Sequence, residues 1–377
     1  MKIVLAPDKF KGSLTGIEFC DAVTEGIHSV FPKAEIIKIP LADGGDGTID
    51  VLNCHLQGER IEVEVNDPLF RPIKASYFYI RSTAIAYLEM AEASGIRLLT
   101  PEEQNCMNTT TYGTGEIIQD AVNRGAKTII LGLGGSATND CGIGMASALG
   151  YKFIDRSGKG IIPIGKNLHK IKTIDASKVS KALKKVTFKV ACDVANQLYG
   201  LKGAAYIYGS QKGASQNEVM LLNRGLYHIA NIFSNQFNID VQNKKGSGAA
   251  GGMGAGTLVF LNADLLSGID LVKELIDFDA NIKDADWVIT GEGELDDQTL
   301  SGKTIYGVIM SAQENNIPVA ALCGSVLLQK ESLKSLGISY VASILDKAKN
   351  IDDAMTNSYA YLSQVAADFA KKYLIPI

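Results

Sequence analysis

The sequence predicts an α/β fold in which an open parallel sheet of the Rossmann or flavodoxin type is interrupted by an inserted mixed α/β domain. Short apolar runs alternate with helical patterns along the chain, as they do in βαβ units. A length of 377 residues suits two domains, each with its own core. The pattern changes near residue 66 and returns near 264. We therefore expect a discontinuous parallel domain of residues 1–65 and 265–377 around an inserted domain of residues 66–264.

The first part of the parallel domain is predicted from two strand–helix pairs. Thr15 and Glu18 have the spacing of a capping box, in which each side chain bonds to the other residue's backbone N–H at a helix start. A helix is therefore expected to begin directly after Thr15. The expected elements are strands over residues 2–6 and 36–39 and helices over residues 17–30 and 49–56.

The middle of the chain contains strands of a different kind. Residues 61–65 and 75–80 suggest antiparallel pairing, with Pro68 and Pro72 marking the turn between them. A glycine-dense segment at 247–256 could be a hinge, a helix contact that needs small residues, or a ligand loop. The other expected elements are strands 127–131, 151–154 and 188–191, a helix that follows residues 110–115 and ends near 124–125, and a helix over 143–149.

The end of the chain returns to the parallel pattern. Apolar runs at 286–289, 319–323 and 340–344 predict buried strands with helices between them. Residues 352–373 carry an apolar stripe at helical spacing and predict one long amphipathic helix.

Composition excludes several classes of protein. The net charge of −4 gives no basic field for nucleic acid or anionic lipid. Six widely separated cysteines without a C-x-x-C pair argue against zinc and against a disulfide framework. The sequence shows no signal peptide and no apolar run of membrane-spanning length. We expect a cytoplasmic protein and leave its oligomeric state open, a homodimer included.

The most informative segment is the acidic glycine loop that follows the strand 286–289. Gly291 and Gly293 allow backbone N–H groups to approach a ligand closely. Carboxylates on the same loop, Glu292 and Asp296 among them, would repel a bare phosphate but hold the Mg²⁺ that accompanies one. Lys303 follows at the expected start of a helix. Together these residues predict a site for a nucleotide phosphate and its metal ion.

The triplet Gly302-Lys303-Thr304 is not the end of a Walker A loop. That motif requires a glycine five residues before Gly302, and position 297 is Asp. A triplet of this kind is also typical of an ordinary helix start. The acidity of the loop, rather than the triplet, favours a phosphate site.

Four loops of this character follow predicted strands, at residues 7–13, 42–48, 132–140 and 291–303. Each combines glycine or lysine with Asp, Ser or Thr. In open parallel sheets such loops share the carboxyl edge, where ligands bind. Their repetition favours a binding site over a set of ordinary turns.

Single residues in these loops have a functional and a structural interpretation. Lys11 could neutralise a transferring phosphate, whereas Lys9 is better explained as a surface lysine. Asp43 could bind a metal ion or a substrate hydroxyl, or simply form a turn. Asp193 directly follows the strand 188–191, where it could accept a proton from a nucleophilic hydroxyl or cap a helix.

One pattern supports a different enzyme class. Gly132-x-Gly134-x-x-Ala137 fits a relaxed dinucleotide fingerprint, and Asp155 lies at the end of the strand 151–154. This combination favours a nicotinamide-dependent oxidoreductase as the alternative. Hydride transfer, however, gives no reason for the acidic loops. A non-catalytic two-domain sensor would bind nucleotide without turnover.

The same loops carry a resemblance to a known family. The matching segments are residues 6–8 with 10–13, 42–48, 110–115, 134–140, 192–194, 211–214 and 289–293, followed by Asp296, Gln298, Thr299, Gly302 and Lys303. In these segments the chain resembles the bacterial type I glycerate kinases (glycerate 2-kinase-like), and the resemblance spans essentially the whole chain.

The resemblance implies ATP-dependent phosphorylation of D-glycerate, with 2-phosphoglycerate expected, and a site in the cleft between two α/β domains. With the physics of phosphoryl transfer it suggests Asp193 as base and Lys11 as clamp. Asp296 and Glu292 would hold Mg²⁺. The residues expected to bind nucleotide or phosphate are Gly134, Gly135, Ser136, Thr138, Asn139, Gly291, Gly293 and Lys303. Those expected to bind substrate are Ser13, Asp43, Thr111 and Gly113.

Overall fold

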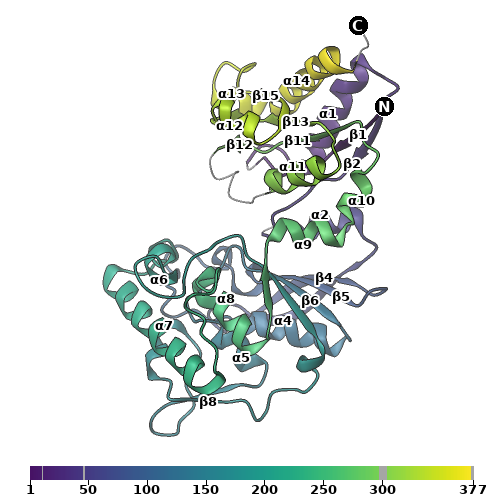
Figure 1. Ribbon diagram of the computed structural model, residues 1–377. Helices are drawn as coiled ribbons and strands as arrows, with labels where there is room; N and C mark the ends of the chain where they lie inside the picture. The colour runs from purple at the N-terminus through teal and green to yellow at the C-terminus, as the bar shows by residue number, and fades with distance from the viewer. Residues whose placement is uncertain (11, 46, 297–303, 375–377) are drawn as a thin grey trace. The chain divides into compact units, whose positions relative to one another are not determined.

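The computed structural model has an α/β fold with two compact units (Figure 1). Unit 1 comprises Met1–Asp43 with Ile269–Ile377, and unit 2 comprises Gly44–Gly268. The predicted α/β class is confirmed. The structure describes residues 1–10, 12–45, 47–296 and 304–374.

Unit 1 is built on a five-stranded sheet in the order β15-β13-β11-β1-β2, in which every neighbouring pair is parallel. All of these strands were predicted from apolar runs. Their bounds are β1 (Lys2–Leu5), β2 (Glu35–Lys38), β11 (Trp287–Thr290), β13 (Val319–Cys323) and β15 (Ile338–Ser343).

The direction of the chain through this sheet reverses beside β1. The chain passes from β1 to β2 on one side, and β11, β13 and β15 are added on the other. The loops that follow β1 and β11 therefore begin side by side at the carboxyl edge. In open parallel sheets this switch point is where ligands bind.

Two helices, α1 (Gly16–Val30) and α14 (Ser358–Tyr373), pack together and bury their apolar faces against the sheet (Figure 1). Gly26 makes their close approach possible, because a Cβ atom there would lie 2.1 Å from the Ser363 carbonyl oxygen. The predicted capping box at Thr15 is confirmed. The other helices of this unit are α9 (Gly268–Leu275), α10 (Phe278–Ile282), α11 (Thr304–Glu314), α12 (Lys330–Ser335) and α13 (Ile351–Thr356).

The prediction of one continuous helix over residues 352–373 is wrong. It is two helices, α13 and α14, which separate at Asn357. The Asn357 side chain donates to the Asp353 carboxylate at 2.8 Å. Asparagine favours helix ends because its amide competes with the backbone for hydrogen bonds, and the apolar stripe carried no signal of this break.

Unit 2 contains a six-stranded sheet in the order β10-β9-β6-β5-β4-β3. The predicted antiparallel pair is confirmed as β3 and β4, and β5, β6, β9 and β10 are mutually parallel. Strand β5, central in the sheet, was not predicted. The bounds are β3 (Glu59–Asn66), β4 (Pro72–Ile80), β5 (Ile85–Glu89), β6 (Thr128–Gly132), β9 (Thr187–Ala191) and β10 (Asp264–Leu266).

Pairing with β4 places β3 in unit 2. Residues up to 65 were expected in the first domain, whereas the two compact units divide after Asp43 and after Gly268. An antiparallel pair forms one structural element, so its two strands belong to the same unit.

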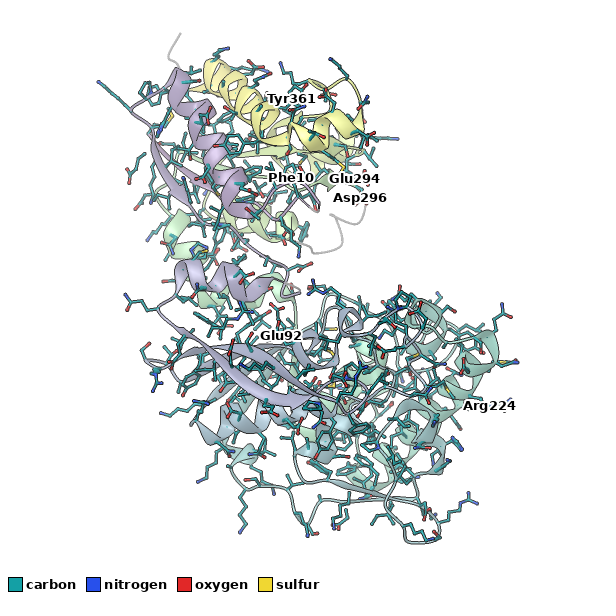
Figure 2. The ribbon with its side chains drawn as sticks, turned by 180° about the vertical axis from the view of Figure 1, so that it is seen from behind. Phe10, Glu92, Arg224, Glu294, Asp296 and Tyr361 are labelled. Atoms are coloured by element: carbon teal, nitrogen blue, oxygen red, sulfur yellow. The ribbon has the colours of Figure 1, made fainter. Side chains whose placement is uncertain are left out.

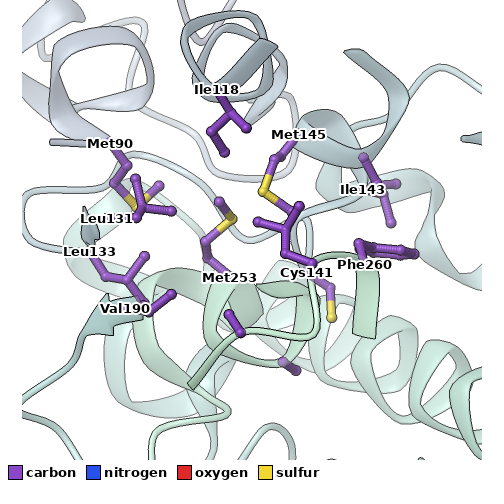
Figure 3. Close-up of a cluster of buried hydrophobic side chains, with 14 of the residues drawn as sticks. Met90, Ile118, Leu131, Leu133, Cys141, Ile143, Met145, Val190, Met253 and Phe260 are labelled. Carbon is purple, nitrogen blue, oxygen red and sulfur yellow. The ribbon is translucent and has the colours of Figure 1, made fainter. Parts of the chain in front are cut away.

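Helices and a dense apolar core complete unit 2. Figure 3 shows part of this core, in which Leu131 and Val190 of the sheet lie near Met253. The longest helix, α7, was not predicted. The remaining α-helices and strands described in this unit are α2 (Thr48–His55), α3 (Ala91–Ser94), α4 (Tyr112–Asn123), α5 (Ile143–Ala148), β7 (Lys152–Ile154), β8 (Thr173–Asp175), α6 (Ala204–Tyr208), α7 (Gln216–Phe237) and α8 (Ala249–Phe260). In unit 1, β12 (Glu294–Leu295) pairs with β14 (Ser325–Val326).

The glycine-dense segment makes close contacts inside unit 2. A Cβ atom on Gly251 would lie 2.1 Å from the Thr138 carbonyl oxygen, and one on Gly254 would lie 2.1 Å from that of Gly246. Gly251 also has a left-handed φ of +69°, which glycine adopts without strain. These contacts require small residues, as one interpretation expected, but their partners Thr138 and Gly246 lie outside helices. The interpretations as a hinge or a ligand loop stay predictions.

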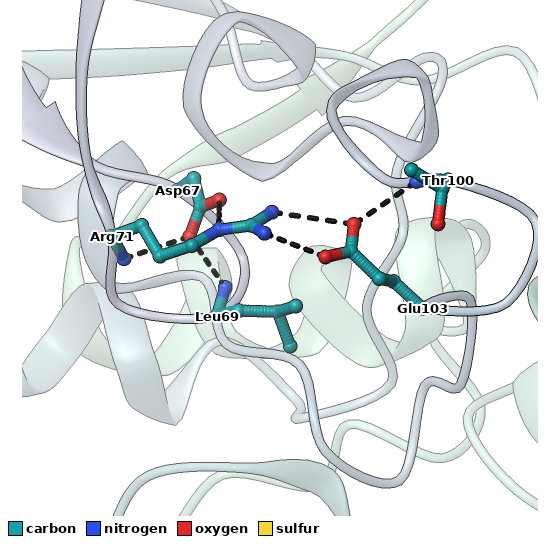
Figure 4. Close-up of polar contacts among 5 residues, drawn as sticks. All are labelled: Asp67, Leu69, Arg71, Thr100 and Glu103. Carbon is teal, nitrogen blue, oxygen red and sulfur yellow. Dashed lines mark hydrogen bonds and ion pairs between the residues drawn. The ribbon is translucent and has the colours of Figure 1, made fainter.

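An ion-pair network fixes the turn between β3 and β4 (Figure 4). The buried Asp67 accepts from the backbone N–H groups of Leu69 and Arg71 at 2.7 and 2.9 Å, and from Arg71 Nε at 2.6 Å. Arg71 in turn donates to Glu103 at 2.6 Å. The carboxylate of Asp67 therefore satisfies the turn's own donors.

Replacing Asp67 by Ala should lower the free energy of unfolding by about 2 kcal/mol, because it leaves two backbone donors without their acceptor. Asp50→Ala is the matched control. Its carboxylate is 79% exposed and lies 3.5 Å from Arg60, and such pairs contribute little. Urea unfolding monitored by circular dichroism measures both. Equal effects would contradict the role given to Asp67.

No helix in the described part of the chain combines the length and apolar character needed to cross a membrane.

Candidate active site

In unit 1, Asp8 lies where the switch point of the sheet places a ligand site. It follows β1 by three residues, and its backbone N–H donates to the Gly291 carbonyl oxygen at 2.9 Å. The Thr304 hydroxyl, at the start of α11, donates to Asp8 Oδ2 at 2.7 Å. Asp8 thus joins the loops after β1 and β11 to the start of α11.

The surroundings of Asp8 disfavour the ionised form of its carboxyl group. Burial raises the pKa of its carboxyl group, and the negative charge of Asp43 raises it further. Hydrogen bonds from Thr304 and from the Lys9 backbone oppose this rise in pKa. Two carboxylates whose charges repel each other in a buried site would be stabilised by a cation between them.

The loop after β11 is ordered by pairing with residues 324–327. The backbone N–H groups of Gly324 and Ser325 donate to the carbonyl oxygens of Glu292 and Gly293 at 3.0 and 2.9 Å. Gly291 is buried, and a Cβ atom there would lie 2.0 Å from the Leu322 carbonyl oxygen. Close packing therefore requires a glycine at position 291. Its predicted contact with phosphate stays a prediction.

Asp296 and Glu294 lie two residues apart at the end of this ordered segment (Figure 2). The half-buried Glu292 and Asp296 both stand in the loop where the sequence predicted metal ligands. Within residues 1–10, 12–45, 47–296 and 304–374, no group of three or more His, Cys, Asp or Glu side chains could hold a metal ion. Mg²⁺ commonly takes only one or two carboxylates and completes its shell with phosphate oxygens and water.

Three other predicted residues belong to this unit. The Ser13 hydroxyl oxygen is buried and has no hydrogen-bond partner among the described residues, so it is available to a ligand. Lys11 and Lys303 lie outside the described residues.

In unit 2, the loop after β6 runs from an exposed tip to a buried end. Gly134 and Gly135 are exposed, whereas the residues from Ser136 to Asp140 are buried. The Ile96 N–H donates to the Gly135 carbonyl oxygen at 2.9 Å, and the Ala137 N–H donates to that of Ser94 at 2.9 Å. The backbone around Ser136 is therefore firmly held.

The buried Asp140 connects this loop to two helices. It accepts from the N–H and hydroxyl groups of Thr111, each at 2.8 Å, and from the N–H groups of Gly144 and Gly142 at 3.1 and 3.2 Å. Burial raises the pKa of Asp140, and these four bonds oppose the rise. Asp140 thus fastens the start of α4 to the start of α5.

These contacts give Thr111 and Gly113 a structural role. Both polar groups of Thr111 bond to Asp140, and its hydroxyl oxygen also accepts from the Met145 N–H at 2.9 Å. A Cβ atom on Gly113 would lie 1.9 Å from the Asn66 carbonyl oxygen. Their predicted contact with substrate stays a prediction.

A lysine that was not among the predicted site residues lies behind the same loop. Lys212 is buried, and its Nζ donates to Ser136 Oγ at 2.6 Å and to the Thr138 carbonyl oxygen at 2.9 Å. Burial lowers the pKa of Lys212 to about 8, against the opposing effects of Cys106 and Asp140.

Two neighbouring side chains in this loop have unused polar atoms. The Thr138 hydroxyl oxygen and both amide atoms of Asn139 are buried without a hydrogen-bond partner among the described residues. Buried polar groups are normally paired, so such atoms point to a missing ligand or water.

Asp193 follows β9 and lies at the carboxyl edge of the second sheet. Its side chain is exposed, and one carboxylate oxygen accepts from the Gly268 N–H at 3.0 Å. This bond orients the carboxylate at the edge where parallel strands present ligand sites. An exposed, oriented carboxylate in this position suits a base.

Comparisons with known proteins assign the chain to a family. A model of the glycerate kinase family matches residues 3–374. The chain belongs to the glycerate kinase family. The glycerate kinase of Halalkalibacterium halodurans is 43% identical over 368 residues, which cover 98% of this chain and 97% of that protein. The glycerate 2-kinase of Escherichia coli is 39% identical over 370 residues, with 98% and 97% covered.

The fold leads to the same family. A crystal structure of a protein proposed to be glycerate kinase 2 from Salmonella typhimurium LT2 superimposes with a TM-score of 0.88 and 38% identity. The match covers 99% of this chain and 98% of that one.

The alternative of a nicotinamide-dependent oxidoreductase is not supported. A dinucleotide fingerprint needs a helix directly after its glycines, but the loop containing Gly134 and Ala137 continues to α5, which begins at Ile143. Asp155 follows β7, which forms a separate antiparallel pair with β8. It therefore does not follow a strand adjacent to β6 in a parallel sheet, where a ribose-binding acid would lie.

Asp8, Asp140 and Lys212 belong to the candidate site but were not named as site residues from the sequence. Asp8 could have been found, because an acid close after the first strand of a parallel sheet stands at the edge where ligands bind. Asp140 and Lys212 lie in segments that carry the resemblance, but their burial depends on contacts between distant segments, which local pattern does not show.

Proposed function

We propose that this protein is an ATP-dependent glycerate kinase, which transfers the γ-phosphoryl group of ATP to a hydroxyl of D-glycerate and yields 2-phosphoglycerate. The observation that carries this proposal is the full-length similarity to known glycerate kinases at 39–43% identity. Membership of the family implies ATP as the co-substrate. The carboxylates of Asp8 and Asp43 in unit 1 also support the proposal, because their negative charges favour the cation that accompanies ATP.

Mg²⁺ fits the residues of unit 1. Glu292 and Asp296 would hold it, and the negative charges of Asp8 and Asp43, which repel each other, favour a cation in the same unit. When bound, Mg²⁺ neutralises charge on the ATP phosphates.

The chain's own residues would then carry the transfer. Asp193 accepts the proton of the glycerate hydroxyl as its oxygen attacks the γ-phosphorus, and the bond from that phosphorus to the bridging oxygen of ADP breaks. Lys11 and Lys303 neutralise charge on the transferring group. The exposed glycines Gly134 and Gly135 offer backbone N–H groups to a substrate oxyanion, and Ser13 offers its unpaired hydroxyl.

Release of ADP tests the proposed function. Purified protein with Mg²⁺ and ATP should release ADP rapidly only when D-glycerate is added, because the acceptor completes the reaction. ADP release that does not depend on glycerate would contradict the proposal. Nucleotide binding without any turnover would indicate a sensor.

Lys11→Ala should cost about 2–4 kcal/mol of transition-state stabilisation, a loss of roughly 30- to 1000-fold in kcat/KM, if this lysine clamps the phosphate. Lys9→Ala, two residues away in the same loop, is the matched control and should retain near-normal activity. Steady-state kinetics at saturating Mg²⁺ measures both. A loss below tenfold for Lys11→Ala would assign Lys11 to the surface.

A further inference from the structure

Lys212 is a buried cation that the proposed roles do not use. Its side chain is 5% exposed, and no carboxylate of the described residues makes an ion pair with it. Asp140 acts on it only at longer range, and four hydrogen bonds from other groups already occupy Asp140. A buried charge without a paired counter-charge is costly to the fold, so its presence calls for an explanation.

The hydrogen bonds of Lys212 connect it to the exposed tip of the 134–140 loop. An ammonium group has three donors, and Lys212 uses two of them on Ser136 Oγ and the Thr138 carbonyl oxygen. Ser136 is 8% exposed and directly follows the exposed Gly135. The serine therefore stands between the buried cation and the surface.

This arrangement polarises the Ser136 hydroxyl. Because its oxygen accepts from the ammonium group, its own proton must point elsewhere, and the neighbouring positive charge makes it a stronger donor. Further along the same loop, the Thr138 hydroxyl and the Asn139 amide are buried without a hydrogen-bond partner among the described residues. Hydrogen-bond donors backed by a positive charge are what an oxyanion requires.

We propose that Lys212 is a positioning residue that holds Ser136 as a donor to a substrate oxyanion at the 134–140 loop and supplies the positive charge behind it. The oxyanion is a carboxylate or a phosphate oxygen, and glycerate and ATP are the two sources. This inference rests on the proposed kinase activity. It assigns to the loop a chemical role that its glycines alone do not provide.

The test uses the full chain with Lys212→Met, Ser136→Ala and the double variant. Lys212→Met should raise the KM for one of the two substrates at least about tenfold, and Ser136→Ala should raise the KM for the same substrate about fivefold. Because the lysine acts through the serine, the double variant should be no worse than Lys212→Met. A change in the KM for ATP identifies phosphate as the oxyanion, and a change in the KM for glycerate identifies carboxylate.

Ser147→Ala is the matched control in unit 2. It removes a half-buried hydroxyl that donates to the Ile143 carbonyl oxygen at 2.8 Å, and it should leave both KM values unchanged. Thermal unfolding of every variant separates a loss of fold from a loss of binding. If Lys212→Met does not fold, Ser136→Ala and the pH profile of the wild-type chain decide the question.

The dependence of kcat/KM on pH distinguishes this role from a purely structural one, because a lysine that only supports the fold would not change it. Burial lowers the pKa of Lys212 to about 8, so kcat/KM for the affected substrate should fall as pH rises above 8 and the positive charge is lost. The other titratable groups facing Lys212 are Cys106, whose pKa burial raises to about 11, and Asp140. The Cys106 thiol, with a pKa of about 11, keeps its proton between pH 7 and 9.

Unchanged KM values for both substrates in Ser136→Ala, or a kcat/KM that stays flat to pH 9, would overturn the inference. Independent, multiplying effects of the two single substitutions would do so as well. If the wild-type chain phosphorylates glycerate and these variants behave like Ser147→Ala, only this inference fails. If the wild-type chain does not turn over glycerate, the proposed function itself fails.

Discussion

Asp193→Asn is expected to reduce kcat by about 10²–10⁴-fold while leaving the affinity for Mg-ATP nearly unchanged. Asparagine keeps an oxygen that can accept from the Gly268 N–H, which lies 3.0 Å from the carboxylate, but it cannot take a proton from the glycerate hydroxyl. The loss should therefore appear in turnover rather than in nucleotide binding. Rapid-quench measurement of the chemical step, together with equilibrium titration of ATP, separates the two.

Asp264→Asn is a suitable control for this substitution. It also removes an exposed carboxylate, on the neighbouring strand β10 of the same sheet. Its turnover should match that of the wild-type chain. Near-normal turnover of Asp193→Asn would eliminate Asp193 as the base and leave it as a cap for the Gly268 N–H.

Asp8→Asn should lower kcat/KM by about 100-fold or more without destabilising the fold. Burial and Asp43 raise the pKa of Asp8, so its ionised form costs folding free energy near neutral pH. The neutral amide removes that cost and can still bond to Thr304 and to the Lys9 backbone. The melting temperature should therefore stay the same or rise while the activity falls, which is the behaviour of a charge kept for function.

Asp21→Asn provides the comparison for Asp8 within unit 1. The Asp21 carboxylate is 46% exposed and pairs with Lys38 at 2.6 Å, so its loss should change neither activity nor melting temperature appreciably. A drop in the melting temperature of Asp8→Asn that accounts for its lost activity would make Asp8 a structural residue.

The parallel strands were predictable because each is a short apolar run that helices cover. β1, β11 and β13 are almost fully buried, and a strand buried on both faces appears in the sequence as an uninterrupted apolar segment. The order of the strands was not predictable. It depends on β11 pairing with β1 across an insertion of more than two hundred residues, and local pattern carries no information about that pairing.

The candidate site was only partly predictable for a similar reason. Asp193, Glu292 and Asp296 follow apolar runs, and this position made them candidates in the sequence. Lys212 could not, because its role depends on contact with Ser136, a residue 76 positions earlier in the chain. Gly113, selected for ligand contact, also has a structural explanation, since close packing against Asn66 requires a glycine there.

Phosphorus NMR of the complete reaction tests the central claim most directly. With the protein, Mg²⁺, ATP and D-glycerate present, the γ-phosphate signal should be replaced by the signals of ADP and by one new phosphomonoester signal coupled to the C2 proton of glycerate. Omission of glycerate should leave the ATP signals intact. Formation of inorganic phosphate alone, or persistence of ATP beside glycerate, would contradict the assignment of this protein as a glycerate kinase.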